Sequence, residues 1–259
     1  MPPLLEFRGV TVPRGEVPVL HALDLEIGVA EHVAILGPNG SGKSTLIKTI
    51  TRECYPRQDA GTRLRILGRE SWDIFDLRRH LGIVTPDLLA RAPEDVTGRE
   101  AVLSGFFSSD GLWWGRQTVT PAMEERVTKT LERLEALTLG DRPIRELSSG
   151  ELRRVQIARA LVHDPETLLL DEPSANLDLF AQGELRRILR GLARAGTGLV
   201  LVTHHLADII PEVERVILLR SGRIVGDGPK AELLCPERLE GLFGVPVEVT
   251  ERGGYYHAW

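Results

Sequence analysis

Apolar and polar positions alternate along the first third of the chain and predict a β-rich beginning. Alternating or continuous apolar runs lie between turn residues at 5–7, 10–12, 17–20 and 23–27. Residues 63–68 alternate in the same way and are able to join the same sheet. Short runs with this period are typical of strands. We therefore expect strands over these five segments.

A helical pattern replaces the alternation between residues 87 and 165. The segments 97–100 (Thr-Gly-Arg-Glu) and 148–151 (Ser-Ser-Gly-Glu) are capping-box patterns ahead of apolar stretches. Thr120-Pro121 is a further helix start, because proline is favoured in the first turn of a helix. The sequence therefore predicts a mostly helical region here.

Alternation of strands and helices returns after residue 165. The runs 167–170 and 198–203 are apolar throughout, and a helical stretch over 179–195 separates them. Strands without polar alternation that are joined by helices are typical of a parallel sheet covered on both faces. A hairpin of residues 216–219 with 223–225 is predicted to follow. A tail over 229–259 is predicted to contain a short helix.

A glycine-rich segment, Gly-Pro-Asn-Gly-Ser-Gly-Lys-Ser-Thr at 37–45, follows the strand-like run 32–36 and has the spacing of a P-loop. Glycines let backbone N–H groups crowd around a phosphate, and the next helix points its positive end at the same anion. At this spacing Lys43 reaches the β- and γ-phosphates, and the Ser44 hydroxyl is a ligand for Mg²⁺. A glycine-rich turn without a ligand is the alternative interpretation.

Two adjacent carboxylates, Asp171 and Glu172, end the apolar run at 168–170. In a doubly wound sheet the carboxyl ends of the strands form the edge where ligands bind. One carboxylate there can hold Mg²⁺, and the other can take the proton from an attacking water. With the P-loop alone, kinases, GTPases, helicases and motor proteins all stay open.

A second anion-type segment narrows this choice. Leu-Ser-Ser-Gly-Glu at 147–151 puts hydroxyl groups and a glycine at a predicted helix start. Ser-Ala-Asn-Leu-Asp at 174–178 and His204 follow in order. The series resembles the ATP-binding cassette (ABC) ATPases: P-loop, signature, Walker B, D-loop and switch histidine. The family signature usually reads Leu-Ser-Gly-Gly-Gln, so Ser149 and Glu151 are departures from it.

The resemblance covers nearly the whole chain and implies a fold. The expected class is an α/β P-loop NTPase cassette with a parallel-sheet core, an antiparallel β subdomain and a helical signature subdomain. We expect one ABC ATPase domain over 1–259. Its parts are assigned to 1–86 with 166–228 for the core and β subdomain, 87–165 for the helical subdomain, and 229–259 for the tail.

The resemblance also implies roles for single residues. Phosphate binding falls to Gly37, Asn39, Gly40, Ser41, Gly42, Lys43, Ser44 and Thr45. Ser44 and Asp171 are expected at Mg²⁺, Glu172 as general base or water-orienting group, and His204 at the γ-phosphate. Two cassettes of the family dimerise head to tail, so Ser148, Ser149 and Gly150 are expected to contact ATP on a second copy. Asp178 is expected to link the two nucleotide sites.

Two positions depart from the family pattern near the nucleotide. Where the family usually has a glutamine, counting gives Pro86, which has no polar side-chain group. We hypothesise that Asp87 takes over a ligand role at Mg²⁺. Where the family often stacks an aromatic ring on adenine, spacing gives Arg14, whose guanidinium plane can also stack on a base. A solvated turn arginine is an equal alternative.

An aromatic cluster in the helical region has two interpretations of equal weight. Phe106, Phe107, Trp113 and Trp114 are close in sequence, and Leu112 precedes the tryptophans. In the family this lobe receives a helix from a membrane subunit, so the cluster is either that docking surface or internal core. Together with the segment 84–89, the Ser-Gly-Phe-Phe element at 104–107 resembles molybdate-type or metal-type importer cassettes.

The composition of the chain limits the kinds of partner and cellular location that we expect. The chain has 259 residues, 27% of them charged, a net charge of −5 and two cysteines. We expect no nucleic-acid partner, no disulfide framework, no membrane span and no signal peptide. The resemblance implies a cytoplasmic subunit on the inner face of the membrane. It hydrolyses ATP to drive transport, with transmembrane permease subunits and, as a further candidate, a substrate-binding protein. A soluble ABC ATPase and a regulatory ATP-binding module are the alternatives.

Overall fold

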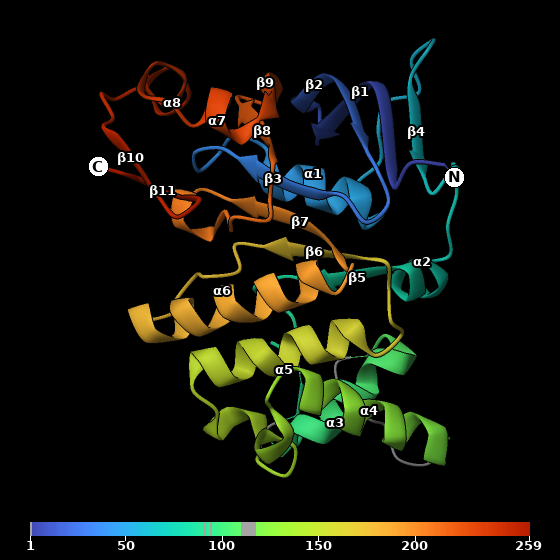
Figure 1. The fold of residues 1–259 in the computed structure, drawn as a ribbon. Helices are drawn as coiled ribbons and strands as arrows, with labels where there is room; N and C mark the ends of the chain where they lie inside the picture. Colours follow the sequence, from blue (N-terminus) through green and yellow to red (C-terminus); the bar gives the residue numbers. More distant parts are fainter. Residues whose placement is uncertain (1, 91, 94, 110–117) are drawn as a thin grey trace.

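A six-stranded sheet with the order β5-β6-β7-β3-β8-β9 runs through the centre of the computed structural model, which describes residues 2–90, 92–93, 95–109 and 118–259 (Figure 1). Neighbouring strands from β5 to β8 are parallel, and β9 pairs with β8 in the antiparallel sense. The predicted parallel sheet and hairpin are therefore confirmed. The strands are β3 (His32–Leu36), β5 (Leu81–Val84), β6 (Thr167–Asp171), β7 (Gly198–Thr203), β8 (Arg215–Arg220) and β9 (Arg223–Pro229).

A separate three-stranded antiparallel sheet has the order β2-β1-β4. Its strands are β1 (Leu5–Arg14), β2 (Val17–Ile27) and β4 (Arg63–Ile66). The four short runs predicted before residue 28 are thus two long strands. The pairing shifts register between Phe7 and Val10, and Gly9 lies there with a positive φ of 57°. Such bulges interrupt the alternation without ending the strand.

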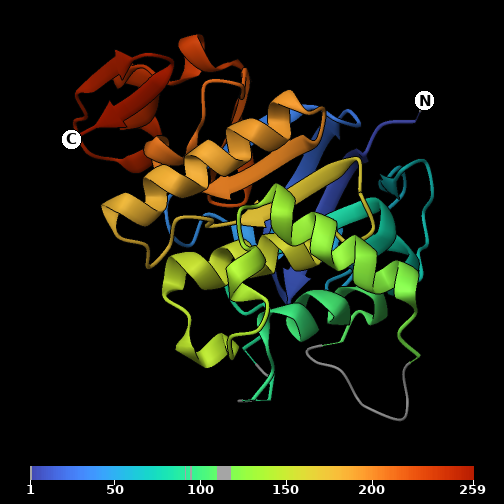
Figure 2. The same ribbon diagram turned by 60° about the horizontal axis from the view of Figure 1, so that its bottom comes forward.

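The helical elements gather mainly on one side of the central sheet, and they come forward in Figure 2. The capping residues Thr97, Thr120 and Ser148 lie where the sequence predicts helix starts, and each accepts a hydrogen bond from a backbone N–H group. The α-helices are α1 (Lys43–Ile50), α2 (Ile74–His80), α3 (Gly98–Leu103), α4 (Pro121–Arg133), α5 (Ser149–Leu161), α6 (Leu179–Arg194), α7 (Lys230–Leu233) and α8 (Pro236–Phe243). Short 3₁₀ turns are η1 (Ser104–Phe107), η2 (Leu137–Leu139), η3 (Ile144–Glu146) and η4 (Leu206–Asp208).

Two hydrophobic cores lie on opposite faces of the central sheet. Leu168 and Leu170 of β6 belong to the core shared with α3 to α6, whereas Leu169 between them belongs to the core shared with α1, β1 and β2. Successive side chains of a strand point to opposite faces. Apolar residues at every position of β6 and β7 therefore hold both cores on one sheet.

The tail returns to the sheet edge near His204. After α7 and α8 it forms a hairpin of β10 (Val249–Arg252) and β11 (Tyr255–Ala258), and β11 packs against η4. Tyr255 and Tyr256 of this hairpin pack on the core beneath the helices. The structure thus gives the tail a fixed place. In the described part of the chain, no helix is long and apolar enough to span a bilayer.

The turn between β8 and β9 supports the phosphate-loop segment through backbone contacts. The Gly222 N–H group donates to the Ser41 carbonyl oxygen at 2.7 Å, and its own carbonyl oxygen accepts from the His21 N–H group at 2.9 Å. Gly222 has a φ of 71°, and an added Cβ would overlap the Val19 carbonyl oxygen. Only glycine meets both demands without strain.

We expect Gly222→Ala to lower the free energy of unfolding by more than about 2 kcal/mol, since both backbone strain and steric overlap oppose it. Gly15→Ala is the matched control, because its φ is 64° but no atom lies within 4 Å of the added Cβ. That control should lose only about 1 kcal/mol. Urea unfolding measures both. Equal losses would contradict the role assigned to the contact with Val19.

Candidate functional site

The segment between β3 and α1 forms a tight loop that opens into a helix. Gly42 stands at the N-cap of α1 with a φ of 108°, and an added Cβ there would lie 2.9 Å from the Leu20 side chain. The first backbone N–H groups of α1 therefore face outward from a turn that only glycine adopts readily. This is the arrangement in which a helix start binds an anion.

Lys43 is folded back over this loop. Its Nζ donates to the carbonyl oxygens of Gly37 at 2.8 Å and Pro38 at 3.1 Å, and lies 3.4 Å from Glu172 Oε1. The residue is only 6% exposed. A buried ammonium group thus lies against the loop that the sequence pattern assigns to phosphate binding.

Glu172 joins this lysine to the switch histidine. Its Oε2 lies 2.7 Å from Nδ1 of His204, while its Oε1 faces Lys43. The backbone of Glu172 has a φ of 45°, and its N–H group donates to the Val202 carbonyl oxygen at 2.8 Å. A non-glycine residue with positive φ is uncommon and is often found at functional sites. The carboxylate is therefore fixed between two groups that follow β3 and β7.

Asp171 lies beside Glu172 at the end of β6. Burial, and then the negative charge of Glu172, raise the pKa of Asp171 to about 6, while Lys43 and Arg153 act in the opposite direction. Two adjacent carboxylates at a partly buried sheet edge disfavour each other's ionised form. A cation bound there relieves this repulsion.

One cavity brings most of the predicted nucleotide residues together. It is lined by Arg14, Val19, Asn39, Gly40, Gly42, Lys43, Ser44, Thr45, Pro86, Asp171, Glu172 and His204. Gly37 and Ser41 are not among the lining residues, and the buried Ser41 Oγ has no hydrogen-bond partner among the described residues. Asp87 is not part of the lining, although its charge contributes to the raised pKa of Asp171.

The signature segment lies at the start of α5 and forms the predicted capping box. Ser148 Oγ accepts from the Glu151 N–H group at 3.3 Å, and Glu151 Oε2 accepts from the Ser148 N–H group at 2.8 Å. Ser148, Ser149, Gly150 and Asp178 line a second cavity, which shares no lining residue with the first. Within one chain, therefore, the two anion-type segments do not face a common ligand space.

Two buried polar residues of α5 were missed by the sequence analysis. Arg153 is 7% exposed, and its charge interacts with Asp171 and Asp208. Gln156 Nε2 donates to the Leu88 carbonyl oxygen at 2.6 Å, which ties the segment after β5 to the signature helix. Polar residues within an otherwise apolar helical stripe were the available signal.

A third residue that the sequence analysis missed stands next to the switch histidine. Thr203 Oγ1 donates to Asp208 Oδ2 at 2.5 Å and accepts from the His205 N–H group at 3.0 Å. Both Thr203 and Asp208 are buried. These bonds fix the backbone on either side of His204.

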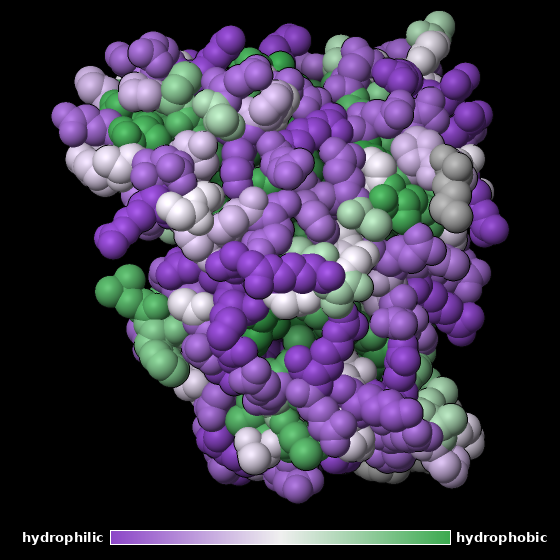
Figure 3. All heavy atoms as spheres, in the orientation of Figure 1, coloured by the Kyte–Doolittle hydropathy of each residue, from purple (hydrophilic) through white to green (hydrophobic). Residues whose placement is uncertain are grey.

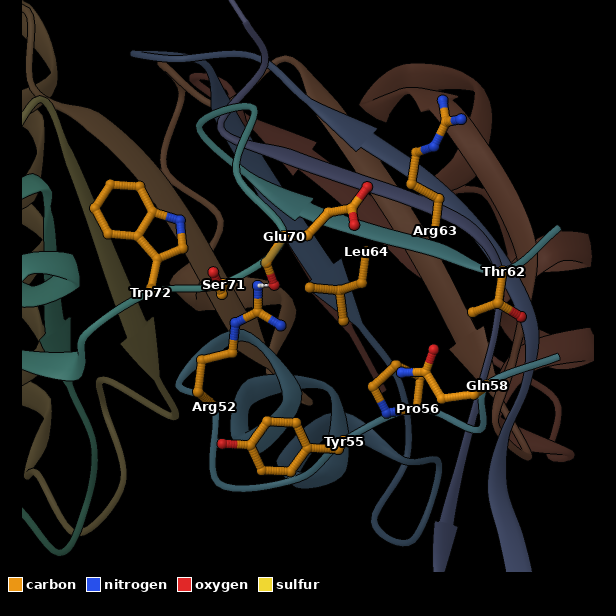
Figure 4. A pocket seen from close by; sticks show the side chains of 10 residues that line it. All are labelled: Arg52, Tyr55, Pro56, Gln58, Thr62, Arg63, Leu64, Glu70, Ser71 and Trp72. Carbon is orange, nitrogen blue, oxygen red and sulfur yellow. Dashed lines mark hydrogen bonds between the residues drawn. The ribbon is translucent and has the colours of Figure 1, made fainter. Parts of the chain in front are cut away.

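The structure describes only part of the predicted aromatic cluster. Phe106 packs on the core beneath the helices and meets the His163 ring edge-on at 5.1 Å between centroids. Leu112, Trp113 and Trp114 lie outside the described residues. A further cavity, lined by residues such as Arg52, Tyr55 and Trp72, lies between the end of α1 and β4 and contains none of the predicted site residues (Figure 4).

A phosphate loop, paired carboxylates and a histidine at one sheet edge define a P-loop nucleotide hydrolase. The model of the ABC transporter family matches residues 20–175, more than half of the chain. A hemin import ATP-binding protein of Rhodococcus jostii is 32% identical over 249 residues, covering 94% of this chain and 80% of that protein. A cobalt import ATP-binding protein of Rhodobacter capsulatus is 36% identical over 244 residues, with coverage of 90% and 81%. The chain belongs to the ABC transporter family, as its ATP-binding, ATP-hydrolysing subunit.

Solved structures agree with this assignment. The protein cbiO1 of Clostridium perfringens, part of the transporter complex cbiONQ, has a TM-score of 0.76 at 25% identity, covering 92% of this chain and 93% of that one. The dimeric cassette MJ0796 in a post-hydrolysis state with ADP and Pi has a TM-score of 0.70 at 26% identity, covering 87% and 98%. The predicted fold class, an ABC cassette, is confirmed.

We expect Asp171→Asn to raise the unfolding temperature of the nucleotide-free protein at pH 8 by a few degrees. In the folded chain the pKa of Asp171 is about 6, above the ordinary value of 3.8, so ionisation near neutral pH opposes folding. The advantage of the variant should shrink as the pH falls from about 6 toward 4, because Asp171 of the folded wild-type chain then becomes protonated and as neutral as asparagine. Calorimetry without Mg²⁺ tests this, and an advantage independent of pH would contradict it.

Proposed function

We propose that two copies of this chain bind two ATP molecules between them and hydrolyse them to drive import of a metal-containing solute through separate membrane subunits. The observation that carries the proposal is that the phosphate loop and the signature segment line two cavities with no lining residue in common within one chain. In a head-to-tail dimer the phosphate loop of one copy meets Ser148, Ser149 and Gly150 of the other. Each ATP then has donors from both.

The oxygen ligands in the phosphate-loop cavity fit Mg²⁺. The Ser44 hydroxyl and the Asp171 carboxylate line the same space, where burial and then the negative charge of Glu172 raise the pKa of Asp171. Hard oxygen donors suit this small divalent cation. Held there with ATP, Mg²⁺ would neutralise charge on the phosphate oxygens.

The remaining side chains act by position and charge. Lys43 lies over the loop with its ammonium directed to the phosphate position, and Glu172 is placed to orient or deprotonate the attacking water. His204, whose Nδ1 faces Glu172, presents the rest of its ring to the γ-phosphate position. Arg14, which lines the same cavity, stacks on the base of the nucleotide. Asp178 lines the signature cavity and connects the two sites across the dimer.

The names of the relatives favour a metal-type substrate. Hemin and cobalt are named for two proteins that resemble this chain over most of its length. For this chain we infer a location on the inner face of the cell membrane, with permease subunits in the bilayer and a substrate-binding protein outside. Its net charge of −5 gives no support for a nucleic-acid partner.

We expect Glu172→Gln to slow ATP hydrolysis by about 10² to 10³-fold while ATP binding is retained, because the amide cannot accept the proton of water. Glu166→Gln is the matched control, since Glu166 is exposed and precedes the opposite end of β6. Steady-state phosphate release and a filter-binding assay with labelled ATP measure the two properties. A wild-type rate equal to that of the variant would contradict the proposal and identify an ATP-binding regulatory module instead. Pro86, which replaces the glutamine usual in the family, supports that alternative.

For Asp87→Ala we expect a roughly tenfold higher Mg²⁺ concentration at half-maximal activity, because Asp87 acts on the metal site in place of the absent glutamine. Asp59→Ala, at an exposed carboxylate outside the cavity, serves as the control. Magnesium titrations at saturating ATP supply the measurement. An unchanged Mg²⁺ dependence and hydrolysis rate would remove Asp87 from the site.

A further inference from the structure

An exposed pair of large apolar side chains stands at the beginning of α6. Leu179 is 83% exposed and Phe180 is 77% exposed, the two highest values among the large hydrophobic residues that the structure describes. Figure 3 shows a hydrophobic projection at the edge of the molecule where α6 begins. Single exposed apolar residues are common, whereas these two are adjacent and form one exposed apolar surface at the helix start.

The pair is held rigidly rather than carried on a loose loop. Asp178 caps α6, with its Oδ1 accepting from the Ala181 N–H group at 2.7 Å, and Gln182 Nε2 donates to the Leu177 carbonyl oxygen at 3.0 Å. Leu179 and Phe180 are therefore the first two residues of a well-formed helix of 16 residues. A fixed apolar surface binds with little loss of conformational entropy.

The pair also lies directly beside the signature segment. Phe180 lines the same cavity as Ser148, Ser149 and Gly150. A Cβ added to Gly150 would lie 2.8 Å from the Ala181 side chain, so the starts of α5 and α6 are in close contact. Whatever molecule covers the signature serines therefore also approaches Leu179 and Phe180.

We propose that Leu179 and Phe180 pack against a second copy of this chain and stabilise the ATP-bound dimer. This inference rests on the proposed function, in which the signature serines of one copy meet the nucleotide of the other. The apolar pair continues that contact surface along α6. Two-fold symmetry repeats the contact, so four large side chains leave water when the dimer closes.

The contact acts on closure and not on nucleotide binding by one chain. Neither residue lines the phosphate-loop cavity. Their removal should therefore leave the affinity of the monomer for ATP unchanged and weaken only the association of two ATP-loaded chains. This separation gives the proposal its test.

The experiment uses the full chain with Glu172→Gln, so that bound ATP is not consumed. The test variant adds Leu179→Gln and Phe180→Gln, which keep the helix cap at Asp178. Phe75→Gln is the matched control, because Phe75 is 54% exposed, is also the second residue of its helix, and follows a capping aspartate, Asp73. Sedimentation velocity over a range of protein concentrations with ATP and Mg²⁺ gives the dimer dissociation constant, and a fluorescent ATP analogue gives monomer affinity.

We expect the dissociation constant of the dimer to rise at least about tenfold in the double variant, with monomer affinity and the Phe75→Gln dimer unchanged. An unchanged dimer overturns the inference and leaves the proposed function standing. Failure of the Glu172→Gln parent to dimerise with ATP overturns both. Equal loss of monomer ATP binding in the double variant also overturns the inference, because the residues would then act on the nucleotide site itself.

Discussion

The carboxyl ends of the parallel strands meet at one edge of the sheet, and the phosphate loop, the paired carboxylates and His204 all depend on that alignment. In the register of β3 with β7, Leu36 is paired with Thr203, so the phosphate loop and His204 begin side by side. In the register of β6 with β7, Asp171 is paired with Val202. Lys43, Glu172 and His204 are far apart in sequence, yet the Glu172 carboxylate contacts both of the others. Its Oε1 lies 3.4 Å from Lys43 Nζ, and its Oε2 lies 2.7 Å from His204 Nδ1. Their geometry comes from backbone pairing in a core that is apolar on both faces.

The signature helix α5 lines the second cavity at its first turn and carries Arg153, whose charge acts on Asp171 in the first cavity. Its first turn faces the space that we assign to the partner's nucleotide, and its interior reaches the chain's own site. Arg153 brings a buried positive charge toward Asp171, and Gln156 holds the segment that follows Pro86. The charged sheet edge and the signature segment are therefore linked through one helix. This is a physical connection through packed side chains and hydrogen bonds.

The sequence was informative where chemistry depends on local spacing. The phosphate loop, the capping box at Ser148 and the apolar strands were all predictable, because each is defined by a few consecutive residues. The merging of the first four runs into β1 and β2 was not, because a bulge breaks the alternation without ending a strand. Arg153 and Thr203 were missed for a different reason. Arg153 interacts with Asp171, and Thr203 donates a hydrogen bond to Asp208. Only the fold brings these partners together and buries them.

The ion pair between Lys43 and Glu172 has a consequence for how ATP binding responds to salt. The ammonium already faces a carboxylate before nucleotide arrives, so a phosphate that takes its place exchanges one ion pair for another. The net electrostatic gain is the difference between the two pairs, and screening by salt weakens both. Backbone N–H groups of the loop, which carry no net charge, add to the affinity. ATP affinity in this protein should therefore vary less with ionic strength than its net phosphate charge suggests.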